Sequence, residues 1–339
     1  GIDGFGHRFR KLTIGRAAEQ SSAERHGARR CAAVRGGARR CAAAARGMME
    51  RACVARRHRR ASDNLAGTHP VVIIDLIPRT LIGGTLVGLA AVRAYRRNEL
   101  TSGGAYAAFA LGTAAVAGGI GWAGALAAFF YTAMLFGDWR ADVKRQRSFN
   151  VLPDSRARDA WQVLANGGLF AVAAVSWGVS GRWEAGLFGF GALAAATADT
   201  WATEIGMALD AAPRLIVSWK PVPPGTSGGV SAFGLGAAVA GSFFVALVAV
   251  ASFSTPFDIP RLEAVLVGGL AGAMTDSLLG ASVQSRRWCE SCGEWTERRV
   301  HPCGFRSRHR AGISWVTNDV VNLLATAVGG LVAVSAWRP

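Results

Sequence analysis

The sequence predicts an all-α, polytopic membrane protein with about seven to eight transmembrane helices. Hydrophobic residues make up 51% of the 339 residues and charged residues only 18%, which is below the charged share of ordinary soluble domains. The apolar residues also cluster into stretches of roughly 20, the length at which a helix crosses a bilayer. Such spans must be helices, because open strands would leave backbone groups without partners in hydrocarbon.

The apolar stretches begin after His69 and give the expected spans in order. In the first span, Pro78 lies near the start, and Asp75 and Arg79 are spaced so that they share one helix face. The "GGIG" stretch at 118–121 divides the next apolar segment into a hairpin of two helices. The expected spans are 71–92, 104–137 (two helices), 163–181, 184–209, 229–253, 261–283 and 315–337.

Residues 1–69 differ in composition from the integral membrane domain expected at 70–339. They carry 16 Lys/Arg against five Asp/Glu and contain the near-repeat "GARRC" at 27–31 and 37–41. Basic segments of this kind are typical of binding to nucleic acid or anionic lipid. Because the segment is monotonous in Ala, Arg and Gly and has no Met before Met48, we expect it to be disordered or non-native, and we expect no nucleic-acid partner.

The basic residues between the spans predict the orientation in the membrane. The four longer connections carry 18 Lys/Arg between them, whereas the three short connections carry only Arg182. By the positive-inside rule, the basic loops face the cytoplasm of a multi-pass plasma or inner membrane protein. The longer connections are 93–103, 138–162, 210–228 and 284–314, and the short ones are 118–121, 182–183 and 254–260.

Carboxyl and amide side chains fall inside several predicted spans, toward their cytoplasmic ends. A carboxylate at this depth costs about 2.5–3.5 kcal/mol on insertion scales, so it usually marks a functional site. Neighbouring carboxylates repel unless a cation lies among them, and Mg²⁺ prefers carboxylate and carboxamide oxygens. The alternative is a buried structural acid paired with an arginine. The expected magnesium ligands are Asp199, Glu204, Asp276 and Asp319, and the accompanying amides are Asn166, Asn318 and Asn322.

The stretch "PRLIVSWKPVPPGTSGGVSAFG" at 213–234 predicts a phosphate-binding turn. Its glycine-rich part comes directly before a span, where backbone N–H groups and the helix dipole attract anions. Two cationic side chains are close by in sequence, although the Gly-Lys-Ser/Thr of a Walker A loop is absent from the stretch. The alternative is a simple turn. The residues expected to bind phosphate are Arg214, Lys220, Gly225, Thr226, Ser227, Gly228 and Gly229.

The loop at 284–314 contains "WCESCGEWTERRVHPCG". A Cys-x2-Cys pair followed by a nearby His and Cys fits a tetrahedral, structural Zn²⁺ site. The alternative is three free thiols in a reducing cytoplasm. The expected zinc ligands are Cys289, Cys292, His301 and Cys303.

Taken together in their order, these motifs resemble the family known as domain of unknown function 92. That family includes transmembrane protein nineteen of animals and the phytyl-phosphate kinase of plants. The stretches that carry the resemblance are "DAWQVLANGG" (159–168), "ADTWATEIG" (198–206), the turn at 213–231, "DSLLGASVQ" (276–284), the Cys-x2-Cys loop and "TNDVVN" (317–322). The matching positions are Asn166, Asp199, Thr200, Glu204, Pro213, Arg214, Gly225 to Gly229, Asp276, Asn318, Asp319 and Asn322.

The resemblance implies phosphoryl transfer from a nucleoside triphosphate, CTP or ATP, to an isoprenoid monophosphate or another lipid monophosphate at the cytoplasmic leaflet. In that reading Mg²⁺ bridges the nucleotide phosphates, and Arg214 neutralises charge on the transferred group. One alternative is an ion- or proton-coupled transporter, because intramembrane acids beside glycine-rich helices also describe transport sites. Another is a scaffold whose zinc-like loop binds a protein.

Overall fold

The computed structural model describes residues 73–337 except 153–156, 210–211 and 253–258. The predictions for residues 1–69 therefore lie outside the described residues, as does the side-chain pairing expected of Asp75 and Arg79. The described chain folds into eight long helices, one short helix and five short strands. The helices are α3 (Ile73–Arg96), α4 (Ser102–Gly118), α5 (Ile120–Asp138), α6 (Ala141–Ser148), α7 (Ala160–Ser180), α8 (Trp183–Ala208), α9 (Ala232–Ser252), α10 (Ile259–Ser282) and α11 (Asn318–Ala336).

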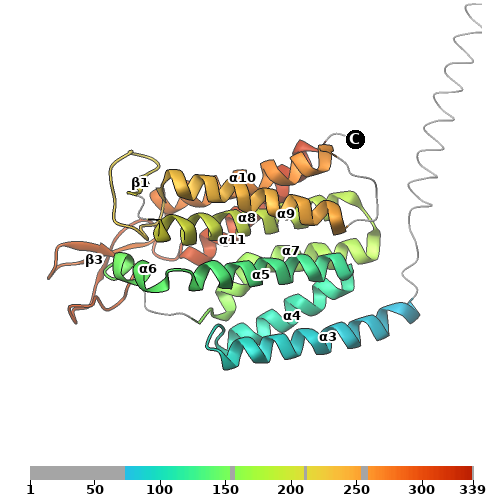
Figure 1. The fold of residues 1–339 in the computed structure, drawn as a ribbon. Coiled ribbons are helices and arrows are strands. Elements are labelled where there is room, and N and C mark those ends of the chain that lie inside the picture. The colour runs from blue at the N-terminus through green and yellow to red at the C-terminus, as the bar shows by residue number, and fades with distance from the viewer. Residues whose placement is uncertain (1–72, 153–156, 210–211, 253–258, 338–339) are drawn as a thin grey trace, which may run out of the picture. The chain divides into compact units, whose positions relative to one another are not determined.

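The long helices run alternately in opposite directions, so the long connections all meet at one end of the bundle (Figure 1). We call this the loop end; it contains α6, the turn around β1 and the segment around β3 (Figure 1). At the opposite end, the predicted break between α4 and α5 falls at Gly119, whose φ of 133° ends one helix and starts the next. The predicted all-α fold class and the alternation of long and short connections are confirmed.

Among the described residues, five helices are long and apolar enough to cross a membrane: α5, α7, α9, α10 and α11. Of the other long helices, α4 has 17 residues, and α8 carries Asp199 and Glu204 within its length. The position of α8 explains its composition. It packs against α7, α9, α10 and α11, and most of its residues from Gly186 to Ala198 are buried. Because its neighbours are helices rather than lipid, α8 can contain polar groups that a lipid-facing helix would exclude.

Small residues let α8 and α10 approach closely. A Cβ added at Gly272 of α10 would lie 2.3 Å from the Cβ of Ala195 on α8 and 2.8 Å from the carbonyl oxygen of Ala325 on α11. Van der Waals contact between backbones at small residues is a main source of stability between membrane helices. These contacts fix the spacing of α8, α10 and α11 around the site described below.

Two small antiparallel sheets lie at the loop end, and the sequence did not predict them. Strands β1 (Arg214–Leu215) and β2 (Gly229–Val230) pair to close the glycine-rich turn. Strands β3 (Arg286–Cys289), β4 (Glu294–Thr296) and β5 (Arg308–Ala311) form a three-stranded sheet in the order β4-β3-β5. Strands of two to four residues give too little alternation to be recognised in a single sequence.

The Gly272→Ala variant tests the close contact between α8 and α10. The added methyl overlaps Ala195, so we expect it to lower the free energy of unfolding by about 1–3 kcal/mol. Gly236→Ala on α9 is the matched control, because nothing lies within 4 Å of its added Cβ, and alanine is the better helix former. Thermal unfolding in detergent, followed by tryptophan fluorescence, measures both. Equal midpoints for the two variants would contradict the assigned contact.

Candidate functional site

A cavity of about 370 Å³ lies at the loop end, lined by residues of α8, α9 and α10, the glycine-rich turn and the 284–314 loop. Its lining contains both polar and apolar residues. The polar part of the lining and the glycine-rich turn comprise Asp199, Thr203, Asp276, Ser277, Glu297, Asn318, Gly225, Thr226, Ser227, Gly228 and Gly229. The apolar lining residues include Leu235, Ala238, Val239, Leu270 and Met274.

Asp199 on α8 and Asp276 on α10 lie next to one another in the lining of this cavity. Their carboxyl groups are close enough for each to act on the other through a hydrogen bond. One oxygen of Asp276, Oδ2, is buried and has no hydrogen-bond partner among the described residues. Two adjacent carboxyl groups are both ionised only when a cation compensates them, and Mg²⁺ takes such oxygens as ligands. The unsatisfied oxygen and the donor set therefore fit a divalent cation.

Glu204, which we expected beside Asp199, does not line the cavity. Its carboxylate accepts a 2.5 Å hydrogen bond from Lys144 Nζ, which also donates to the carbonyl oxygens of Phe136 and Gly137. The reason is helical geometry: positions 199 and 204 differ by five residues, which turns them about 140° apart around the helix axis. Lys144 thus joins α6 to the end of α5, and Glu204 anchors α6 to α8 through the same ammonium group. The expected metal role of Glu204 is not supported by its position.

Asp319 also lies away from the cavity, although its neighbour Asn318 lines it. Adjacent helical residues point about 100° apart, and Asp319 instead lies where the charge of Asp159, the N-cap of α7, acts on it. Among the expected amides, Asn166 donates to the carbonyl of Gln162 within α7, and Asn322 is not part of the cavity wall. Of the α11 motif, Asn318 therefore lies in the cavity wall with the aspartate pair, whereas Asp319 lies near the start of α7.

Glu297 is a carboxylate of the cavity that the sequence did not indicate. It follows β4, and its side chain accepts hydrogen bonds from Ser227 of the glycine-rich turn and from Gln284. Its charge acts on Asp276, so the cavity holds a third acid. Burial raises the pKa of the Glu297 carboxyl, while the hydrogen bond from Ser227 and the charge of Arg286 lower it. A glutamate in a charged loop has no sequence signal for this position.

The glycine-rich turn forms the part of the wall nearest α10. All five predicted residues, Gly225 to Gly229, line the cavity. Gly228 has a φ of 78° and lies so close to α10 that an added Cβ would be 2.5 Å from the backbone nitrogen of Ala281, so only glycine fits. Arg214 and Lys220 are exposed and do not line the cavity; the Arg214 guanidinium donates to the carbonyl of Trp219 at 2.9 Å. Arg286 is instead a cation whose charge acts on the Glu297 carboxylate of the cavity.

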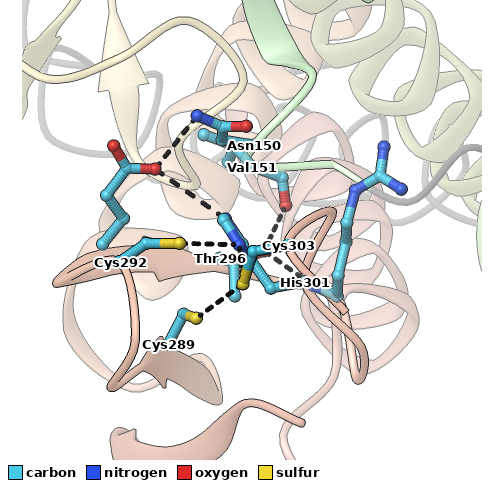
Figure 2. Close-up of polar contacts among 9 residues, drawn as sticks. Asn150, Val151, Cys289, Cys292, Thr296, His301 and Cys303 are labelled. Carbon is cyan, nitrogen blue, oxygen red and sulfur yellow. Dashed lines mark hydrogen bonds and ion pairs between the residues drawn. The ribbon is translucent and has the colours of Figure 1, made fainter. Parts of the chain in front are cut away.

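The four expected zinc ligands converge at the tip of the 284–314 loop (Figure 2). Their donor atoms all lie within 4.8 Å of one another. The Cys289 and Cys303 sulfurs are 3.5 Å apart, and His301 Nδ1 lies 3.5 Å from the Cys292 sulfur and 3.1 Å from the Cys303 sulfur. A backbone hydrogen bond at Phe305 and the hydrogen bond with His301 lower the pKa of Cys303 to about 6. The described cysteines form no disulfide.

Comparison of the sequence with known proteins identifies a family and several relatives. The family described as Integral membrane protein DUF92 matches residues 85–330. Protein PGR of Arabidopsis thaliana is 30% identical over 270 residues, covering 73% of this chain and 92% of its own length. An uncharacterized membrane protein of Methanocaldococcus jannaschii is 33% identical over 187 residues, covering 53% of this chain and 63% of its own. The chloroplastic protein VTE6 of Arabidopsis thaliana is 28% identical over 136 residues, covering 40% and 33%. No solved structure matches the chain.

The Glu204→Gln variant tests whether Glu204 is structural. It leaves the nearly buried Lys144 without its charge partner, so we expect the free energy of unfolding to fall by roughly 3 kcal/mol. Glu184→Gln on the same helix is the control, because its pair with Arg182 is exposed and such pairs contribute at most about 1 kcal/mol. Denaturant unfolding measures both, and an equal loss in the two variants would be evidence against the assigned anchor.

The raised pKa of Glu297 predicts a pH-dependent stability. The folded carboxyl keeps its proton to higher pH than the unfolded one. Without Mg²⁺, the contribution of this carboxyl to stability is therefore present below its ordinary pKa of 4.5 and is lost as the pH rises through the folded pKa. In Mg²⁺-free buffer, the Glu297→Gln variant should therefore gain stability relative to the unmodified protein as the pH rises. Thermal midpoints across acid to neutral pH measure this difference. Glu290→Gln, at an exposed site of the same loop, is the control, and parallel curves for Glu297→Gln would refute the assignment.

Proposed function

We propose, because the chain belongs to the DUF92 family of integral membrane proteins, that it transfers a phosphoryl group from a nucleoside triphosphate to an isoprenoid or other lipid monophosphate. The observation that carries this proposal is the mixed lining of the cavity. Carboxylates and a glycine-rich turn line it together with apolar side chains of α9 and α10. A ligand that fits such a lining has a charged head and a hydrocarbon tail.

Three apolar residues of the cavity lining are also exposed. Leu235 and Val239 on α9 and Met274 on α10 line the cavity and are also exposed, by 42%, 50% and 40% respectively. Exposed apolar side chains on helices of this hydropathy face lipid. A lipid substrate can therefore keep its tail in the bilayer while its head group lies beside the aspartates.

The polar residues supply what phosphoryl transfer needs. Asp199, Asp276 and Glu297 would hold Mg²⁺, which neutralises charge on the nucleotide phosphates when bound. The hydroxyls of Thr226 and Ser227, with the backbone of the turn, would orient the phosphate groups. An oxygen of the lipid phosphate forms the new bond to the transferred phosphorus, and the bond from that phosphorus to the nucleoside diphosphate breaks. The acceptor is already an anion, so the reaction does not require a general base.

The orientation follows from the charges at the loop end. The four long connections that meet there carry 18 Lys/Arg, so we propose that this end faces the cytoplasm, where nucleotides are available. The resemblance of the motifs to the family of the plant phytyl-phosphate kinase supports an isoprenoid monophosphate as the acceptor. With the loop end in the cytoplasm, the head group of the lipid would lie at the cytoplasmic leaflet.

An assay with the purified protein tests the proposal. Protein in detergent is supplied with Mg²⁺, labelled CTP or ATP and prenyl monophosphates, and lipid diphosphate is measured. Asp199→Asn and Asp276→Asn should each lower turnover by about a hundredfold or more, because each removes an anionic ligand of the Mg²⁺ that would neutralise the phosphate charge. Asp142→Asn, at an exposed position of α6, should leave it unchanged. A protein that is inert with all these pairs but moves ions into liposomes would support the transporter instead.

A further inference from the structure

We propose that Cys289, Cys292, His301 and Cys303 bind a structural Zn²⁺, and that this ion holds the 284–314 loop in the shape that places Glu297 in the cavity. The donor geometry is the first support. A tetrahedral ion with zinc–sulfur and zinc–nitrogen bonds of ordinary length separates its donors by about 3.5–3.8 Å. The closest separations here are 3.1 and 3.5 Å, and all four donors fit within 4.8 Å.

Two tight turns present the ligands in pairs. Gly293, with a φ of 69°, donates its backbone N–H to the carbonyl of Cys289 at 2.9 Å and so folds the Cys-x2-Cys pair into a turn. Gly304, with a φ of 87°, donates to the carbonyl of His301 at 2.9 Å and forms the second turn. Both glycines have the left-handed conformation that other residues avoid. The two turns therefore bring the ligands of each pair close together through the backbone.

A carboxylate supports the histidine from outside the cluster, as is common in zinc proteins. His301 Nε2 is buried and lies 3.7 Å from Glu294 Oε2, which leaves Nδ1 directed at the sulfurs. Glu294 in turn accepts a 3.0 Å hydrogen bond from Asn150, in the connection between α6 and α7. The cluster is thus joined to a segment far from it in sequence.

The loop has almost no apolar core that would hold it without a metal. Between 286 and 311 the buried residues are Cys289, Thr296, His301 and Ser307, and two of these four are proposed ligands. The Trp288 and Trp295 rings pack against each other across the sheet but remain partly exposed. Small domains that lack a core commonly depend on a metal for folding. The zinc would therefore supply much of the stability of this sheet.

The sheet carries Glu297 to the cavity. Thr296, the last residue of β4, is buried and donates to the carbonyl of Val151 at 3.3 Å, and Glu297 N–H donates to the same carbonyl at 2.9 Å. The Glu297 side chain in turn accepts a hydrogen bond from Ser227 of the glycine-rich turn. Loss of the ion should free the sheet and withdraw Glu297 from the aspartate pair. This role of Glu297 rests on the proposed function, whereas zinc binding itself does not.

Metal analysis of the full chain, purified in detergent without chelators, tests the ion. We expect about one zinc per chain, and Co²⁺ substituted for it should show thiolate-to-metal charge-transfer absorption. Cys289→Ser should lose the metal, whereas Cys53→Ser, outside the described residues, should retain it. Glu294→Gln keeps all four ligands and should weaken zinc binding by about tenfold in competition with a chelating dye. A metal-free protein that takes up no Co²⁺, or Cys289→Ser with unchanged zinc, would overturn the proposal.

Limited trypsin digestion tests the structural role. Removing the zinc with a chelator should speed cleavage at Arg298 and Arg299 by about tenfold or more, and adding zinc back should reverse this, because the sheet then opens and closes with the metal. Unchanged cleavage would overturn the link between the ion and Glu297. Asp199→Asn should keep its zinc and its resistance to trypsin, so a failure of the proposed transfer reaction is distinguishable from a failure of the zinc site.

Discussion

The close packing of α8 against α10 is the constraint on which the site depends. Small residues bring the two backbones together, as the contact of Gly272 with Ala195 shows. One turn farther along α10 and α8, the same spacing sets Asp276 opposite Asp199. Side chains of greater size at the contact would separate the helices and the carboxyl groups with them. The proximity of the two carboxyl groups therefore depends on the close contact between α8 and α10 one turn away.

The sequence predicted the helices and part of the site well, and the missing parts have physical reasons. Long apolar stretches and glycine breaks give strong signals, so the spans and the break at Gly119 were found. Spacing within a helix was the main error: Glu204 shares a span with Asp199 but points away from it, as Asp319 does from Asn318. The helical period of 3.6 residues per turn would have predicted that the two members of each pair point in different directions.

Residues that reach the site from distant loops could not be predicted in the same way. Glu297 enters the cavity through tertiary contacts with Ser227 and Gln284, and local sequence carries no trace of them. Arg214 and Lys220 show the opposite error, since cations close to the glycine-rich turn in sequence are exposed outside the cavity. The cysteine and histidine cluster was predictable because all four residues lie within one short loop, where spacing nearly determines proximity.

The exposed apolar side of the cavity has a consequence for selectivity. Leu235, Val239 and Met274 belong both to the cavity wall and to the outer surface of the bundle. Under the proposed function, a hydrocarbon chain bound there would leave the protein sideways, and carbons beyond the first few would contact only neighbouring lipids. The site would then distinguish its ligands by head group and by branching near the head, and it would accept tails of quite different length alike.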